Sequence, residues 1–215
     1  MWRNIYQEIK KWTKLWILSD THFNHLFMID GKIRTKNYRT LILERWKSTI
    51  SNEDIVFHLW DVIFKNDWEL SNILRDLPGY KILILGNHDK HSPEWYIKKW
   101  FNEVYYDYII PGDNPILLSH KPTNRMWCEF MICGHLHNYI LKSHRLWDAS
   151  QYIDKHTRVY SAEVEKYYPV LLEDIISTSH ISYQYFYRYW YTKLALLWFI
   201  YLVTHTIKSF FFSSK

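Results

Sequence analysis

The chain has 215 residues, with 27 lysines and arginines against 22 aspartates and glutamates and a formal net charge of +5. This length fits one domain with a sizeable core. The basic residues are spread along the chain, so the modest charge suits an anionic substrate but excludes the basic stripe of a nucleic-acid-binding protein.

The two cysteines, Cys128 and Cys133, provide neither a metal-binding pair nor a disulfide framework. No charged-then-apolar segment opens the chain, so we expect a reduced, cytoplasmic setting.

Five short apolar runs, each ended by polar residues, predict buried strands. Their positions are 14–19, 54–60, 80–86, 116–119 and 130–133. Two more strands are expected later in the chain, at 140–144 and 157–162.

Three helices are predicted between these strands. Apolar residues recur about every 3.6 residues over 37–50. A second helix is expected over 66–77, with Asn66 as its N-cap and Glu69 completing a capping box. A third begins with the Ser-Pro pair at 92–93, because proline suits the first helical position.

Side chains that can bind metals follow all five of the first predicted strands. Ligands of open α/β sheets bind beyond the carboxyl ends of the strands, and divalent metals prefer carboxylate, amide and imidazole donors. Taken alone, a histidine is more often a structural residue and an aspartate is more often a helix cap. That interpretation would have to hold independently at all five strand ends. The residues are Asp20, His22, Asp61, Asn87, His88, Asp89, His120, His135 and His137.

Taken together over residues 14–176, these motifs resemble those of the calcineurin-like metallophosphoesterase family, in its small phage and bacterial form. The resemblance implies an α/β fold, the four-layer αββα metallophosphoesterase sandwich, in which two packed mixed β-sheets are flanked by helices. It also implies two metal sites bridged by the carboxylate of Asp61. The implied ligands of the first metal are Asp20, His22 and His137, and those of the second are Asn87, His120 and His135.

The resemblance further implies hydrolysis of a phosphomonoester or phosphodiester by a metal-bridging hydroxide. His88 matches the family's catalytic histidine and would protonate the leaving oxygen. Asp89 would either orient His88 or cap the next turn. His25 and Arg34 are the candidate substrate-binding residues, although His25 is alternatively a structural histidine and Arg34 a solvated surface charge.

Two divalent metal ions are the expected cofactors. Mn²⁺ is the first choice, with Fe, Zn or Ni as alternatives, because ligand types alone do not select among them. The expected partner is a phosphate-ester substrate, which is a small molecule, a nucleotide or a nucleic acid, and no stable protein partner is predicted. The alternative function is a non-catalytic module of the same fold that binds metal or phosphate.

The chain contains 12 tryptophans and only 5 glycines, whereas proteins average about 7% glycine. The family that the chain resembles usually has glycine before the bridging aspartate, where Trp60 stands. Trp100 follows a predicted helix, where glycine would form the left-handed cap. We hypothesise that some tryptophans, Trp60 and Trp100 above all, replace glycines encoded by UGA, whereas Trp46 lies on an apolar helix face. The alternative is an aromatic-rich natural protein.

Residues 180–215 differ in composition from the predicted phosphoesterase domain at 1–179. They are dense in aromatic residues, and 194–203 form an apolar run shorter than the roughly 20 residues of a membrane-spanning helix. A poorly folded extension, a packed accessory helix and an interfacial membrane contact are the alternatives for this tail.

Overall fold

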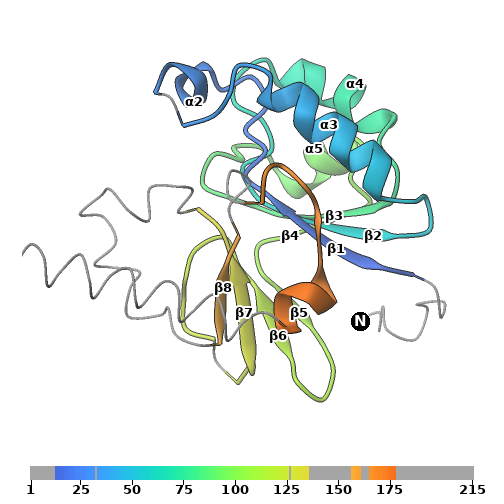
Figure 1. The fold of residues 1–215 in the computed structure, drawn as a ribbon, viewed down its shortest axis with the longest axis vertical. Helices are drawn as coiled ribbons and strands as arrows, with labels where there is room; N and C mark the ends of the chain where they lie inside the picture. Colours follow the sequence, from blue (N-terminus) through green and yellow to red (C-terminus); the bar gives the residue numbers. More distant parts are fainter. Residues whose placement is uncertain (1–12, 32, 126, 136–155, 161–164, 178–215) are drawn as a thin grey trace, which may run out of the picture.

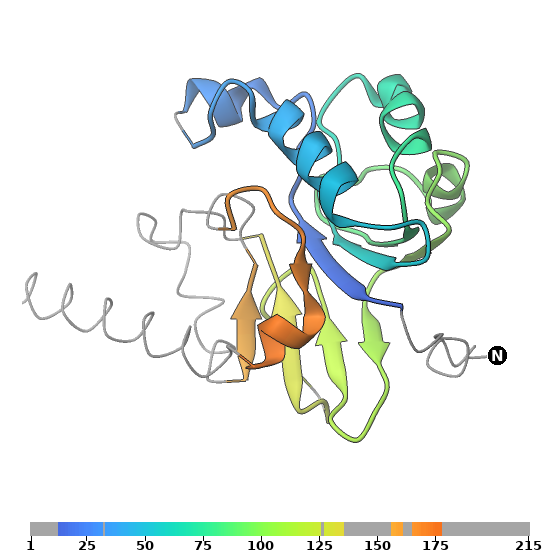
Figure 2. The same cartoon turned by 45° about the vertical axis from the view of Figure 1, so that its right-hand side comes forward.

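The computed structural model describes residues 13–31, 33–125, 127–135, 156–160 and 165–177. Within them the fold is α/β, with two mixed β-sheets, and Figures 1 and 2 show the main helices on the face of the first sheet that points away from the second. A single hydrophobic cluster includes buried residues of both sheets. This architecture is compatible with a two-sheet sandwich.

The first sheet has the order β4-β3-β2-β1-β9. Its four parallel strands are β1 (Leu15–Ser19), β2 (Ile55–Leu59), β3 (Tyr80–Ile84) and β4 (Glu103–Tyr105), and β9 (Val170–Leu171) pairs antiparallel with β1. All five residues of β2 are buried, as expected for a parallel strand covered on both faces.

The second sheet has the order β5-β6-β7-β8. β5 (Tyr108–Ile110) and β6 (Ile116–Leu118) form an antiparallel pair, and β7 (Phe130–Cys133) and β8 (Thr157–Val159) continue the sheet in parallel. The carboxyl ends of β6 and β7 therefore lie at the same edge of this sheet. Residues 172–177 form a helical segment that lies beside the second sheet in both ribbon views.

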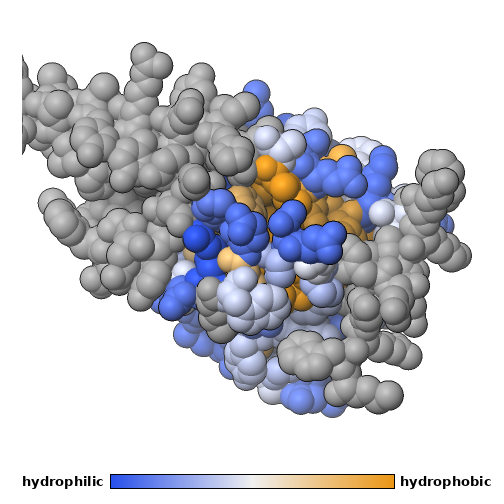
Figure 3. Space-filling model, turned by 90° about the horizontal axis from the view of Figure 1, so that it is seen from below, coloured by the Kyte–Doolittle hydropathy of each residue, from blue (hydrophilic) through white to orange (hydrophobic). Residues whose placement is uncertain are grey.

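The remaining helices follow the strands of the first sheet. They are α2 (Leu26–Asp30), α3 (Tyr38–Thr49), the 3₁₀ helix η1 (Asp67–Glu69), α4 (Leu70–Arg75) and α5 (Pro93–Ile97). None of the described helices is long and apolar enough to cross a membrane. Seen from below, the described surface has a hydrophobic area bordered by hydrophilic residues (Figure 3).

All five strands that were predicted before the metal-binding residues are confirmed. Each end lies within two residues of its predicted position. The helices predicted at 37–50 and from Pro93 are also confirmed. The capping box at 66–77 is wrong: Asn66 has a left-handed backbone (φ 52°) and no capping hydrogen bond from its side chain. Glu69 instead pairs with Arg39 at 3.1 Å, and the helix is divided into η1 and α4.

Several elements lie beyond what the sequence pattern predicted or outside the described residues. α2, β4 and β5 were not predicted, since runs of three to five residues carry little periodicity. The strand expected at 157–162 is described as β8, which ends at Val159. The strand expected at 140–144 and the tail at 180–215 fall outside the described ranges.

The backbone distinguishes the tryptophans singled out in the sequence. Trp60 and Trp100 have positive φ angles of 61° and 79°, the left-handed region that glycine favours. Trp46 lies within α3, is fully buried and donates its indole N–H to the carbonyl of Pro78 at 3.0 Å. The first two therefore stand at glycine-like positions and the third at an ordinary core position.

Candidate metal centre

The predicted metal ligands converge because the strands before them end at facing edges of the two sheets. Asp20 follows β1, Asp61 follows β2 and Asn87 follows β3, all in the first sheet. His120 follows β6 and His135 follows β7 in the second sheet. The site thus combines loops from both sheets, as expected for ligand sites beyond the carboxyl ends of strands.

One cluster consists of Asp20, His22 and Asp61, all of them buried. The Nε2 atom of His22 lies 3.8 Å from Oδ1 of Asp20 and 3.6 Å from Oδ2 of Asp61. Two carboxylates and one imidazole at this spacing form a donor set suited to a divalent cation.

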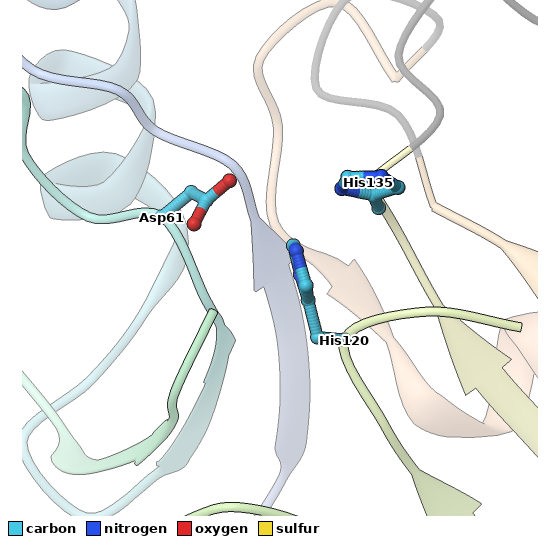
Figure 4. A group of neighbouring side chains, drawn as sticks. All are labelled: Asp61, His120 and His135. Carbon is cyan, nitrogen blue, oxygen red and sulfur yellow. The ribbon is translucent and has the colours of Figure 1, made fainter. Parts of the chain in front are cut away.

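A second cluster consists of Asp61, His120 and His135. Figure 4 shows Asp61 on one side of the gap between the sheets and the two histidines on the other. The two imidazole rings lie 4.6 Å apart, and Nε2 of His120 contacts Oδ1 of Asn87. Asn87 thereby lies beside His120, one of the two histidines with which the family resemblance groups it.

Asp61 belongs to both clusters. It is the residue expected to bridge two metals, and its Oδ1 also accepts a hydrogen bond from the backbone amide of His88 at 2.9 Å. The geometry therefore joins the two clusters through one buried carboxylate.

Four of these residues share an uncommon backbone conformation: Asp20, His22, Asp61 and His135 have φ angles between 45° and 66°. Aspartate and histidine tolerate the left-handed region better than most residues. Strained backbone gathers at functional sites, where the surrounding structure maintains it. No sequence signal indicated this feature, because Asp and His motifs do not specify φ.

Arg34 and Tyr38 support the loop that carries Asp20 and His22. The guanidinium of Arg34 is buried and donates to the backbone carbonyls of Thr21, at 2.7 Å, and Asp20, at 2.5 Å. The hydroxyl of Tyr38 donates to the carbonyl of His22 at 2.5 Å. Arg34 thus lies behind the loop instead of on the surface, and its substrate-binding role stays a prediction.

Asp89 connects two loops of the site. Its Oδ2 accepts hydrogen bonds from the amides of Asp61, at 2.8 Å, and Gly86, at 2.9 Å, and its Oδ1 accepts one from Val62 at 3.1 Å. Burial raises the pKa of this carboxyl, and these hydrogen bonds oppose the rise. These amides belong to the turn before Asp89 and to a second loop. The two roles given in the sequence analysis, orienting His88 or capping the next turn, therefore stay predictions.

His88 and His25 lie beside the first cluster. The ring centroid of His88 is 5.5 Å from that of His22, and Nδ1 of His25 is 3.3 Å from Nδ1 of His22. His25 also stacks on Phe64 at 3.9 Å. The structure therefore brings both candidates to one side of the site, and Phe64 is an additional residue that sequence motifs did not indicate.

His58 is a buried histidine near the site that no motif included. Its Nε2 lies 3.0 Å from the hydroxyl of Thr21, which donates to the carbonyl of Val62 at 2.8 Å. Since that hydroxyl has one proton to donate, His58 donates from Nε2. Burial lowers the pKa of His58 to about 3.

His137 lies outside the described residues, so its expected role as a ligand of the first metal stays a prediction.

Cys128 and Cys133 are buried free cysteines. Burial and the nearby carboxylate of Asp20 raise the pKa of the Cys133 thiol, which keeps it protonated and unsuited to metal binding.

The chain has relatives in archaea and phages, although no family model matches it. It is similar to an uncharacterized protein of Methanocaldococcus jannaschii, with 27% identity over 172 residues that cover 76% of this chain and 89% of the relative. It is also similar to the Gene 66 protein of Mycobacterium phage D29, with 28% identity, 61% coverage of this chain and 82% of the relative.

A solved structure also matches. It is a protein of unknown function from Aquifex aeolicus, with a TM-score of 0.59 and 26% sequence identity. The match covers 77% of this chain and 98% of that chain. This structural match supports the fold over most of the chain. The names of the matched proteins specify no activity.

Proposed function

We propose that the protein is a phosphoesterase that uses two divalent metal ions to hydrolyse a phosphomonoester or phosphodiester. The observation that carries this proposal is that Asp61 belongs to two separate clusters of metal-type side chains. A bridging carboxylate suits ions about 3.5–4 Å apart, the spacing of two-metal hydrolases. The four-layer αββα metallophosphoesterase sandwich is the finer form of the fold under the same proposal.

The donor set fits the cofactor. Asp20, His22 and His137 would hold one ion, and Asn87, His120 and His135 the other, with Asp61 between them. Carboxylate, amide and imidazole donors suit Mn²⁺, and Fe, Zn and Ni remain alternatives. Burial of Asp20, His22 and Asp61 favours this interpretation, because buried charges are normally paired or metal-bound.

Two bound divalent ions would neutralise phosphate charge and lower the pKa of water to near 7. The chain supplies the remaining functions. His88 lies beside His22, from where its imidazole would donate a proton to the leaving oxygen. Asp89 maintains the loop geometry through the amides of Asp61 and Gly86.

The test combines metal content with turnover. The purified chain is analysed for bound metal and assayed on bis-aryl and mono-aryl phosphates with Mn²⁺, with and without chelator. Two metals per chain and chelator-sensitive hydrolysis are expected, and the preferred ester distinguishes diesterase from monoesterase. Bound metal without hydrolysis of either ester would favour the alternative, a non-catalytic metal- or phosphate-binding module.

A further inference from the structure

Trp100 occupies the position that glycine usually takes at the end of a helix. Its amide donates to the carbonyl of Ile97 at 3.2 Å, and the amide of Phe101 donates to the carbonyl of Tyr96 at 3.3 Å. This pair of hydrogen bonds, with φ of 79° between them, is the Schellman motif, in which a left-handed glycine ends the helix. The accompanying hydrophobic contact is also present, because the rings of Tyr96 and Phe101 lie 6.4 Å apart.

The side chain of Trp100 is 52% exposed. Its packing therefore contributes little to offset the strain of the left-handed backbone. A bulky residue with left-handed φ is an outlier. Another bulky residue with left-handed φ, Tyr167, differs: it is buried, and its hydroxyl accepts a hydrogen bond from the amide of Thr35 at 3.4 Å.

Trp60 has the same backbone conformation within the metal centre. Its side chain extends between two glycines, because a Cβ atom at Gly86 would lie 2.5 Å from Cβ of Trp60 and one at Gly134 would lie 2.7 Å from its Nε1. The indole N–H donates to Oδ2 of Asp20 at 3.0 Å, an atom that also accepts from the hydroxyl of Ser19 and from the backbone amide of His135 at 3.4 Å. The ring lies 5.0 Å from that of His120. The side chain therefore fills space between metal-type residues of the two sheets.

We infer that the backbone at positions 60 and 100 is built for glycine, and that the indole of Trp60 obstructs the metal centre by its bulk and by its hydrogen bond to Oδ2 of Asp20. Glycine at position 60 removes the indole and its hydrogen bond to this oxygen, while the donors from Ser19 and His135 stay in place. A UGA codon that the source organism reads as glycine accounts for both positions. The statement about metal access rests on the proposed function, whereas the statement about Trp100 is independent of it.

Three glycine substitutions test the inference on the full chain, with thermal unfolding and Mn²⁺ calorimetry as measurements. Trp100→Gly should raise the unfolding temperature by about 2–4 °C, and Trp100→Ala, which keeps a Cβ, should not match it. Trp60→Gly should tighten Mn²⁺ binding by about tenfold, because a hydrogen bond to a carboxylate is removed. Trp46→Gly is the matched control: it should lower stability and leave Mn²⁺ affinity unchanged.

The outcomes separate the competing explanations. Weaker Mn²⁺ binding by both Trp60→Gly and Trp60→Phe would overturn the inference for position 60, because the indole would then orient Asp20. Trp100→Gly that is no more stable than the parent would overturn it for position 100. If neither the parent nor Trp60→Gly binds Mn²⁺, the proposed function fails, and Trp100→Gly still decides the glycine assignment.

The gene and the native protein provide a second test. UGA codons at positions 60 and 100, a UGG codon at 46, and peptides from the source organism with glycine at 60 and 100 would support the assignment. UGG at position 60 or 100 would overturn it for that position.

Discussion

The carboxylate of Asp89 accepts a hydrogen bond from the backbone amide of Asp61 at 2.8 Å. The two residues are 28 positions apart, and the contact connects the loop after β3 to the loop after β2. Asp89 thereby determines where the shared carboxylate of the metal centre lies.

Asp89→Asn should therefore lower stability. The asparagine side chain would place an N–H against backbone N–H groups that now donate to the Asp89 carboxylate. We expect the free energy of unfolding to fall by about 1–3 kcal/mol. Urea unfolding measures the change, with the exposed Asp107→Asn as control. Unchanged stability with slower turnover would instead support the sequence prediction that Asp89 orients His88.

Asp61→Asn should remove metal and activity together, because both clusters include this carboxylate. The loss of metal affinity should exceed the roughly 10–100-fold effect of changing an outer-shell partner. Metal analysis after dialysis and the aryl phosphate assay measure the two effects. The exposed Asp76→Asn should change neither. Retention of both metals by Asp61→Asn would contradict the bridging role.

His88→Ala should keep the metals but slow turnover by about 10²–10⁴-fold, the usual contribution of general acid catalysis. His91→Ala is a suitable control, because His91 stacks on Trp95 at 3.9 Å and lies outside the motifs. Metal content and kcat are measured on the same preparation. If His88→Ala lost both metals, the division between ligand and acid would be wrong.

Arg34→Lys should destabilise the loop of Asp20 and Thr21, because an ammonium group does not reproduce the fork that donates to both carbonyls. We expect a loss of about 1–3 kcal/mol in unfolding free energy, with weaker metal binding. Stability and KM should be measured together. A raised KM at unchanged stability would support the substrate-binding role predicted from the sequence.

His58 should make stability depend on pH. Its folded pKa of about 3 lies below the ordinary value of 6.5, so below pH 6.5 the unfolded chain binds a proton that the folded protein excludes. The contribution is fully present above pH 6.5 and falls by about 1.4 kcal/mol per pH unit as the pH drops toward 3. Urea unfolding of the parent and His58→Gln from pH 7 to 5 should show a shallower slope in the variant; equal slopes would show that His58 is protonated in the fold.

The sequence predicted the positions of the strand ends well, because each apolar run before Asp20, Asp61 and His120 stops where polar side chains replace apolar ones. Parallel pairing then brings these ends together. The supporting residues were harder to predict, since the roles of Arg34 and Asp89 depend on backbone groups that only the folded chain presents to them.

Local pattern also misled in one place and succeeded in another. Asn66 matched a capping box, but its left-handed backbone prevents that geometry. Trp100 was suspected from the expected need for glycine at a helix end, and its φ of 79° agrees. The sequence therefore indicated a left-handed residue where a helix ends at Trp100. It did not indicate one at Asn66, where the expected helix is divided into η1 and α4.

The sharing of Asp61 by the two clusters also bears on how the molecule holds together. Ions bound there would join the first sheet to the second, whose strands are only three or four residues long. Such short strands contribute few ladder hydrogen bonds. Bound metal ions would therefore add a connection between the first sheet and the smaller second sheet. Removal of the ions would then abolish activity and also remove one connection between the sheets, while their shared hydrophobic cluster would stay in place.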